Sequence, residues 1–504
     1  MPAPRYGALL IVLTLAAAGV CAPGCQRVKN ESGPVTLKIG IGIPTQGSQT
    51  SGARSLISQL RSEPWLTTRA DGRQSDRIVS AWAWDDSHTT LRLTLRKDVR
   101  FHDGTLLTPQ IAADLLRQTA ANAASIFAIS LASVASVEVS GPDSVELHLS
   151  ERNQFVVPDL ALVSVRRQLA SGEDVATGPF QVLKQENQSA VLTAFPQYYR
   201  GRPSIDRIEV ATYPTQRNAW AALMRGEIDM LHEVSRDAAD FVEAETAFNT
   251  YSFPRAYYIP LVFSVRHPAL KNAEVRKAIN EAIDRATLIK DGMSGRGREA
   301  DGPIWPEHWA YAKPAEPFVF NPAAARARLE RAGFPIRASK DGQMPSRFSF
   351  TCVFFGDGRF DRLAVLVQKQ LADVGIDMKL RPVPQQQLEA TLQAGQFDAF
   401  LFEMFGRSLS WVYEFWRSHD GAHFNNGYTA ADLILDRVRG ARTEDEVKAG
   451  MRDLARVFHE DPPAAFISWQ ITSRAVSSKF EVESEEGRDV LTNLWQWRLA
   501  ANRK

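Results

Sequence analysis

Two distant segments of the chain share one order of hydrophobic and polar positions. Residues 208–231 and 378–402 each run from an apolar strand through a proline, an amphipathic helix and a glycine into a second apolar strand. Proline cannot continue a central strand ladder, and glycine adopts the left-handed conformation that ends many helices. Because the proline and glycine stand at similar separations (214 to 226 and 384 to 395), the pattern predicts two α/β lobes built on related crossovers.

The second lobe extends towards the N-terminus by the same reasoning. Residues 347–355 alternate as a strand, residues 362–375 place five apolar side chains on one helical face, and residues 376–380 return as a strand. This β-α-β-α-β order predicts a largely parallel sheet covered by helices. Ahead of it, Asn321 and Pro322 indicate a helix start and Gly333 its end.

The most polar stretch, residues 95–115, has a structural explanation. Its alternating apolar positions predict a strand, Asp103-Gly104 a tight turn, and Thr108-Pro109 a capped helix start. These elements account for every residue except His102. We therefore expect His102 to be structural rather than catalytic.

The N-terminus has the pattern of a secretory signal. Arg5 precedes an apolar run of 14 residues, from Gly7 to Val20. As a helix this run would reach about 21 Å, short of the roughly 30 Å that spans a bilayer core. The following Gly24-Cys25 resembles a bacterial lipoprotein signal, with Cys25 lipidated, although Pro23 leaves simple cleavage as an alternative. Residues 1–24 are thus a predicted signal peptide, and 25–34 a tether to a membrane lipid anchor.

Composition narrows the class of protein. Discounting the signal leaves 504 − 24 = 480 residues, enough for two or three domains. The net charge of +1 argues against a nucleic-acid partner. Cys352 is the single cysteine beyond the leader, so no internal disulfide is expected, and its apolar surroundings predict burial.

The sequence offers no recognisable catalytic or metal-binding motif. It contains no G-x-S-x-G, H-E-x-x-H or Walker A pattern. His419 and His423 are four residues apart, but Gly421 weakens the helix that two metal ligands would need. We expect no metal, no cofactor and no enzymatic activity. Because dispersed carboxylates could still form an acid–base pair, a secreted hydrolase on an α/β scaffold stays an alternative.

Several motifs together resemble one family. They are IVSAWAWDDSHTTLRLTLRKDVRFHDGTLLTPQIAADLL (78–116), ATGPFQVL (176–183), HPALKNAEVRKAINEAIDRATLI (267–289), ARLERAGF (327–334) and QLADVGIDMKL (370–380). In this order and spacing they resemble the extracellular solute-binding proteins of family 5, the receptors of peptide and nickel ABC importers.

The resemblance implies a two-lobed periplasmic-binding-protein-like α/β fold (type II, cluster C-like) with an extra inserted domain. Domain I would comprise residues 35–60, 175–258 and 474–504. Domain II would be the insertion 61–174, and domain III residues 259–473. The segment 253–263 would belong to the hinge between the lobes.

One departure from the family pattern bears on the ligand. Peptide-binding members carry a Gly-Trp-x-Ala-Asp-Tyr motif whose aspartate holds the peptide amine. Here the matching segment, 406–411, is Gly-Arg-Ser-Leu-Ser-Trp. Ser410 cannot balance a buried ammonium, so peptides with a free amine are disfavoured. Arg407 offers bidentate donors to carboxylate or phosphate if it faces the cleft; the alternative is a surface arginine.

Further candidate ligand contacts follow from position. Thr45, Gln46 and Ser48 lie in the loop at the carboxyl end of the first strand, where ligands bind in open α/β sheets; a solvated loop is the alternative. Trp411 and Tyr413 could stack on a ligand, or equally pack in the core.

The sequence therefore predicts an exported, periplasmic and monomeric receptor. It would capture a small-molecule or oligopeptide-like solute between two closing lobes and deliver it to ABC permease subunits. A receptor-like scaffold without a transport role is a further alternative.

Overall fold

Most strands belong to one sheet in the computed structural model, which describes residues 33–42, 51–123, 129–187, 189–235, 238, 241–242, 244–337, 345–356, 360–418 and 424–501. Within these ranges the sheet has twelve strands. Ten follow one path: β10 (Phe180–Gln185), β11 (Ser189–Ala194), β12 (Arg207–Tyr213), β1 (Thr36–Gly42), β13 (Met230–Leu231), β20 (Ala464–Ser477), β14 (Phe248–Phe263), β18 (Ala399–Leu401), β16 (Phe348–Phe355) and β17 (Ile376–Val383). β15 (Gly297–Glu299) pairs with β20, and β19 (Met404–Phe405) with β14.

The two halves of this sheet have the same connectivity. β1 lies between β12 and β13 and runs parallel to both, and β16 lies between β17 and β18 in the same way. The associated helices are α1 (Ser51–Arg61), α4 (Gln216–Met224), α9 (Asp361–Ala372) and α10 (Gln385–Gln393). Gly226 and Gly395, which follow α4 and α10, have φ of +70° and +66°. The predicted pair of α/β lobes is confirmed.

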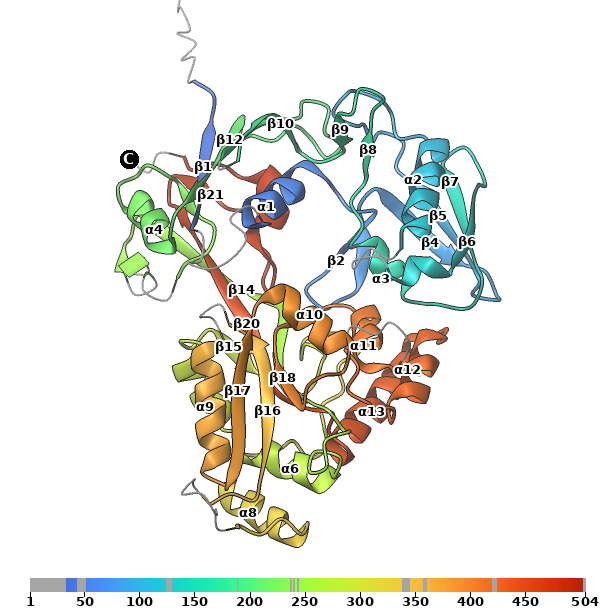
Figure 1. The fold of residues 1–504 in the computed structure, drawn as a ribbon. Coiled ribbons are helices and arrows are strands. Elements are labelled where there is room, and N and C mark those ends of the chain that lie inside the picture. Colours follow the sequence, from blue (N-terminus) through green and yellow to red (C-terminus); the bar gives the residue numbers. More distant parts are fainter. Residues whose placement is uncertain are drawn as a thin grey trace, which may run out of the picture. The chain divides into compact units, whose positions relative to one another are not determined.

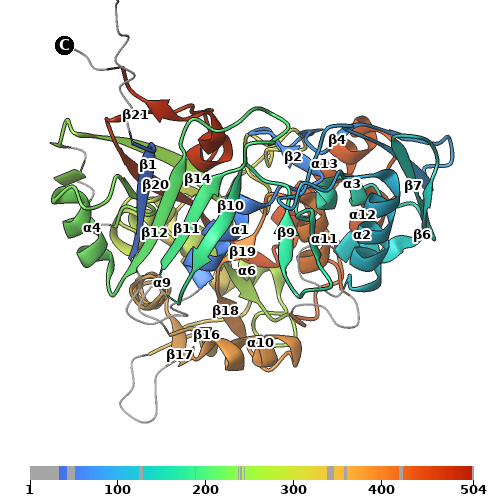
Figure 2. The same ribbon diagram turned by 90° about the horizontal axis from the view of Figure 1, so that it is seen from above.

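Two long antiparallel strands connect the halves. β14 pairs with β20 along most of its length, while β13 pairs with β20 and β18 with β14 (Figure 1). The β14–β20 register shifts between Pro254 and Tyr258, and again between Ile259 and Pro260. Both interruptions lie in the segment predicted as a hinge. Figure 2 shows β10, β11, β12 and β1 side by side in the first half.

Residues 61–176 form a separate group of elements. β4 (Val79–Trp84), β5 (Thr90–Leu95), β7 (Ser144–Leu149) and β6 (Val134–Val139) form an antiparallel sheet in that order. The accompanying elements are α2 (Pro109–Ala121), the 3-10 helix η1 (Ile129–Ser133), α3 (Val156–Leu160), the β2 (Leu66–Thr68)–β3 (Gln74–Asp76) pair and the β8 (Arg166–Gln168)–β9 (Asp174–Ala176) pair. An apolar core of this group runs from Trp65 to Val175. This insertion-like group, residues 61–176, resembles the predicted insertion, and the domain boundaries stay a prediction.

The turn and helix start predicted for residues 95–115 are confirmed. Gly104 has φ +82°, and the Thr108 hydroxyl accepts from the Ile111 amide at 3.3 Å, one turn into α2. His102 is structural: its Nε2 lies 3.0 Å from the Gly178 carbonyl oxygen, and burial lowers its pKa to about 4.

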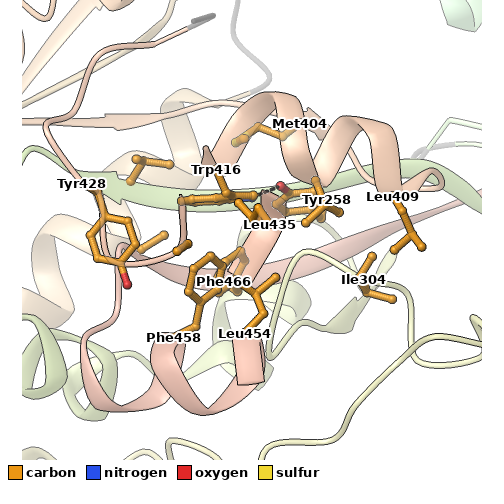
Figure 3. Close-up of a cluster of buried hydrophobic side chains, with 14 of the residues drawn as sticks. Tyr258, Ile304, Met404, Leu409, Trp416, Tyr428, Leu435, Leu454, Phe458 and Phe466 are labelled. Atoms are coloured by element: carbon orange, nitrogen blue, oxygen red, sulfur yellow. Dashed lines mark hydrogen bonds between the residues drawn. The ribbon is translucent and has the colours of Figure 1, made fainter. Parts of the chain in front are cut away.

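Helices of the C-terminal half cover the second lobe. They are α6 (Ala273–Ala282), α7 (Arg285–Thr287), the π-helical turn η2 (Leu288–Gly292), α8 (Pro322–Arg331), α11 (Leu409–Trp416), α12 (Asp432–Arg439) and α13 (Glu444–Glu460). As predicted, the Asn321 side chain caps α8 by accepting from the Ala324 amide, and Cys352 is buried. An aromatic cluster links these helices to the long strands, with Trp416 Nε1 donating to the Tyr258 hydroxyl at 3.0 Å (Figure 3).

The C-terminal tail returns to the first lobe. It contains the 3-10 helix η3 (Val490–Gln496) and the pair β21 (Phe480–Glu481) and β22 (Arg498–Leu499). Trp497 is buried with Leu37, Ile39 and neighbouring apolar residues. Arg474 on β20 binds Asp489 of the tail through two hydrogen bonds of 2.6 Å each. The predicted signal and Cys25 lie outside the described residues, among which no helix is long and apolar enough to cross a membrane.

Candidate ligand cavity

A cavity of about 340 Å³ lies between the insertion-like group and the second lobe. Each side contributes several segments that are far apart in the sequence. The lining residues are Gly72, Arg73, Gln74, Trp82, Trp84, His88, Gln154, Val157, Pro158, His308, Trp309, Arg407, Ser408, Leu409, Ala441, Arg442, Thr443 and Glu444. The volume lies at the lower end of the range for small-molecule sites.

One wall is aromatic because of strand alternation. Trp82 and Trp84 are two residues apart on β4, so their side chains emerge on the same face of the sheet. Both are only partly buried. The Trp84 ring stacks on His88, with ring centroids 5.8 Å apart and an interplanar angle of 15°. Both rings also pack against the apolar core of this group, so a ligand can contact the parts of the rings that stay exposed.

The opposite wall carries a third tryptophan next to a network of charges. The Arg73 guanidinium lies 5.4 Å from the centroid of the Trp309 ring. It also forms ion pairs of 2.9 Å with Asp71 and of 2.9 Å with Glu444, the first residue of α13. The Arg73–Glu444 pair joins the two sides of the cavity. Because it is partly exposed, we assign it little stability by itself.

Arg407 has a different electrostatic environment. In the described part of the chain, Arg407 makes one weak hydrogen bond, from Nη2 to the Gly487 carbonyl oxygen at 3.4 Å, and no ion pair. Burial lowers the pKa of the Arg407 guanidinium, and the nearby positive charge of Arg488 lowers it further, while Asp489 acts in the opposite direction. Arg407 is thus a largely buried cation at the cavity wall without a direct carboxylate partner in the described chain.

Backbone pairing fixes where Arg407 lies. Phe405 and Met404 pair with Tyr257 and Tyr258 of β14, and the Gly406 amide donates to the Ala256 carbonyl oxygen at 2.8 Å. A side chain at position 406 would collide with the Tyr258 and Trp469 rings, since an added Cβ would lie 2.5–2.7 Å from their atoms. The glycine therefore lets the chain pass close to the long strands before Ser408 caps α11.

His308 lines the cavity as a buried, neutral side chain. Its Nδ1 accepts from the Ala310 amide at 3.1 Å, which leaves the proton on Nε2. Burial is the main reason why its pKa falls to about 4, against a smaller opposite effect of Asp71. Gly72, with φ +82°, packs directly on the imidazole. His308 can serve as a hydrogen-bond donor to a ligand but is not charged at neutral pH.

Ser410 has an unexpected partner. Its hydroxyl donates to Asp159 of α3 at 2.6 Å and lies 2.7 Å from the Ser408 hydroxyl. With 7% of its surface exposed, Ser410 lies behind the wall that Ser408 and Leu409 form. Position 410 therefore does face a carboxylate, supplied from a residue 251 positions away.

The two aromatic candidates are placed outside the cavity lining of the described chain. Trp411 is buried against Phe405, with ring centroids 5.6 Å apart. The Tyr413 hydroxyl donates to Asp436 at 3.0 Å, and its ring lies 5.5 Å from the Arg439 guanidinium. For both residues the structure favours the core-packing alternative, and ligand contact stays an unsupported prediction.

Of the four predicted ligand contacts that lie in the described part of the chain, Arg407 is the one that lines this cavity. Thr45, Gln46 and Ser48 lie outside the described residues, as do His419 and His423. Sequence reasoning missed Trp82, Trp84 and Trp309. The Trp-x-Trp pair was a usable signal for the first two, since strand alternation places two large aromatic side chains on one face. Nothing local marked Trp309.

The part of the chain that the structure describes contains no cluster of three or more His, Cys, Asp or Glu side chains able to hold a metal ion. The arrangement around the cavity is suited to recognition: flat rings, one under-compensated cation and neutral polar groups.

Comparisons with known proteins agree with this architecture. A family model, bacterial extracellular solute-binding proteins, family 5 (middle region), matches residues 75–426. The chain is 23% identical over 448 residues to the nickel-binding periplasmic protein of Escherichia coli K12, covering 82% of this chain and 84% of that protein.

Two solved structures have the same fold. NikA from Brucella suis, in complex with Fe(III)-EDTA, has a TM-score of 0.80 and 21% identity and covers 92% of this chain and 100% of its own. AppA from Bacillus subtilis, in complex with a nonapeptide, has a TM-score of 0.72 and 21% identity, with coverage of 93% and 100%. The chain is a non-enzymatic solute receptor of an ABC importer, so the hydrolase alternative is set aside. It belongs to the family-5 bacterial extracellular solute-binding proteins.

Proposed function

We propose that this receptor binds a small solute carrying a carboxylate or phosphate, with the anion on Arg407 and a flat or apolar part against the tryptophans of the cavity. The observation that carries this proposal is the burial of Arg407 without a direct acidic partner in the described chain. A largely buried cation is costly unless it is paired, and the described chain gives Arg407 no direct acidic partner. A bidentate anion from the ligand would supply one.

The other charges near the cavity support an anion rather than a cation. Arg73 is already compensated by Asp71 and Glu444. Arg442, which also lines the cavity, is exposed and adds positive potential. The charged lining side chains are three arginines and one glutamate, so a ligand meets a net positive surface.

The relatives bind ligands of different kinds, so they do not identify the ligand of this receptor. One relative is named for nickel, one structure holds Fe(III)-EDTA, and another a nonapeptide. A chelate with free carboxylates fits Arg407. A peptide with a free amine fits poorly, because Ser410 is neutral and Asp159 beside it already accepts three hydrogen bonds.

Capture would proceed by closure about the β14–β20 connection. The ladder interruption between Pro254 and Tyr258 is a point where the two lobes can rotate with little loss of hydrogen bonding. Ligand contacts to both sides of the cavity would stabilise the closed form. The domain boundaries expected from the sequence (35–60, 61–174, 175–258, 259–473 and 474–504) remain part of this proposal.

We also propose that the exported chain is a monomer held at a membrane face through lipidated Cys25, and that it passes its solute to permease subunits. Metabolic labelling with a palmitate analogue tests the anchor. Label that appears on the wild type and is lost in Cys25→Ser supports it, whereas label retained in that variant, or absent from the wild type, contradicts it.

The ligand experiment combines a panel of probes with two arginine variants. Thermal unfolding and calorimetry are carried out with citrate, inorganic phosphate, trialanine and N-acetyl-trialanine on the wild type, Arg407→Gln and the control Arg437→Gln. Arg437 is exposed and pairs with Asp453 on α13, away from the cavity lining. We expect citrate or phosphate to bind the wild type and the control, and Arg407→Gln to bind at least roughly tenfold more weakly. Tighter binding of trialanine than of its acetylated form, unaffected by Arg407→Gln, would refute the proposal.

A further inference from the structure

One buried carboxylate connects the two walls of the cavity. On the insertion side, Val157 and Pro158 of α3 line the cavity, and Asp159 follows them directly. On the other side, Ser408 and Leu409 line it, and Ser410 follows. The hydrogen bond from Ser410 to Asp159 therefore joins the residues immediately behind both walls.

Both carboxylate oxygens of Asp159 accept hydrogen bonds. Its carboxylate accepts from the Ser130 amide at 3.0 Å, from the Ser130 hydroxyl at 2.5 Å and from the Ser410 hydroxyl at 2.6 Å. Only 1% of the residue is exposed. Hydrogen bonds to a buried charged acceptor are strong, and removal of one partner leaves a desolvated group unsatisfied. The Asp159–Ser410 bond thus has a more defined geometry than the partly exposed Arg73–Glu444 ion pair.

Neighbouring contacts extend the same junction. Phe155, 2% exposed, packs into the aromatic cluster of the second lobe with its ring centroid 5.7 Å from that of Tyr413. The backbone amide of Gln154 donates to the Arg439 carbonyl oxygen at 3.0 Å, and the Arg439 side chain forms an ion pair with Glu151. Gln154 itself lines the cavity, so its bond also joins the two sides, but among these contacts the Asp159–Ser410 bond is the one made by a buried carboxylate directly behind lining residues of both walls.

We propose that Asp159 and Ser410 are positioning residues for ligand binding: their hydrogen bond fixes the spacing of α3 and the start of α11, and thereby the width of the cavity. This inference rests on the proposed function of the cavity as the ligand site. The pair acts through Val157, Pro158, Ser408 and Leu409, which would contact the solute. Position 410 then serves the shape of the site rather than direct recognition of a ligand amine.

The first experiment needs no ligand. Spin labels are placed at Asp86→Cys and Asp445→Cys, two exposed positions beside lining residues on opposite sides. The full chain carries Cys21→Ser and Cys25→Ser, so that buried Cys352 is the one native thiol left. Pulsed electron paramagnetic resonance then gives the distribution of distances across the cavity.

We expect one narrow distribution in the background protein, and a broader distribution reaching longer distances in Ser410→Ala and in Asp159→Ala. Asp159→Asn keeps an oxygen for Ser410 and should retain most of the narrow distribution. Asp103→Asn is the matched control, because Asp103 bonds Thr105 and Arg167 within the insertion-like group. The inference would be overturned if Ser410→Ala and Asp159→Ala gave the same distance distributions as the background protein and the control. A lower melting temperature in these variants with no change in distance would overturn it as well.

The second experiment separates this inference from the proposed function. Citrate affinity is measured for the wild type, Ser410→Ala, Asp159→Ala and the double variant. We expect each single change to weaken binding about tenfold, and the double change to weaken it no further, since both remove the same bond. Additive losses would contradict the pairing. If citrate and phosphate fail to bind the wild type, the anion proposal fails, while the distance measurement still decides whether the pair positions the walls.

Discussion

Phe155 gives the most direct test of how the insertion-like group is held on the second lobe. It precedes α3, yet its side chain belongs to the aromatic cluster of the other lobe, next to Tyr413. Phe155→Ala removes the ring and leaves the surrounding side chains of two separate segments to close the space.

The magnitude follows from burial. A phenylalanine buries at least about 150 Å², which at about 25 cal/mol per Å² corresponds to about 4 kcal/mol. Truncation of a buried phenylalanine costs about 3–5 kcal/mol in measured series, in agreement with this figure. Because Phe155 is 2% exposed, we expect a loss of about 3–4 kcal/mol in the free energy that couples the insertion-like group to the second lobe.

Urea unfolding monitored by tryptophan fluorescence and by circular dichroism measures this loss. We expect an earlier transition in Phe155→Ala, with the two signals no longer coincident because the insertion-like group separates first. Phe320→Ala is the control: that ring is 45% exposed, and its removal should change the free energy of unfolding by less than about 0.5 kcal/mol. Equal effects of the two substitutions would refute the docking role of Phe155.

Three further predictions concern single positions. Burial lowers the pKa of His308 to about 4 in the folded protein, against about 6.5 in the unfolded chain. The stability that neutral His308 contributes is therefore present above about pH 6.5 and is lost as the pH falls towards 4, by an amount on the order of 3 kcal/mol. Free energies of unfolding of the wild type and His308→Gln, measured from about pH 7 to about pH 4, should converge, and parallel pH dependences would contradict the burial argument. Gly406→Ala should destabilise the protein by about 1–3 kcal/mol and weaken citrate binding, because the added methyl meets the Tyr258 and Trp469 rings; wild-type melting and affinity would show that the chain can shift there. Cys352 is buried and its pKa is raised by burial, so a thiol reagent should label the native protein with Cys21→Ser and Cys25→Ser very slowly and the urea-unfolded protein at once; rapid native labelling would contradict the packed strand β16.

The elements predicted best were those whose signals lie within a few residues. Asp103-Gly104 and Thr108-Pro109 specify a turn and a cap through local backbone geometry, and the structure has both. Gly226 and Gly395 end α4 and α10 for the same reason. Similar spacing of these local signals was enough to predict that the two lobes share one connectivity, since a crossover of given length allows few arrangements.

The cavity lining was predicted only where a family motif pointed to it. Arg407, which lines the cavity, was selected because its segment departs from a known pattern, and its contact with a ligand stays a prediction. Ser410 was correctly identified as neutral, but its carboxylate neighbour Asp159 comes from a different part of the chain, and no periodicity records such a contact.

The sequence alone thus determined the class of fold, the repeated crossovers, the structural role of His102 and the family. Alternation, capping and positive-φ glycines act over short distances and therefore leave a readable pattern. Tertiary structure alone decided which side chains surround the cavity. Trp82, Trp309, Arg407 and Glu444 come together because β14 and β20 bring the second lobe against the insertion-like group, and such long-range packing depends on shape rather than on sequence neighbours.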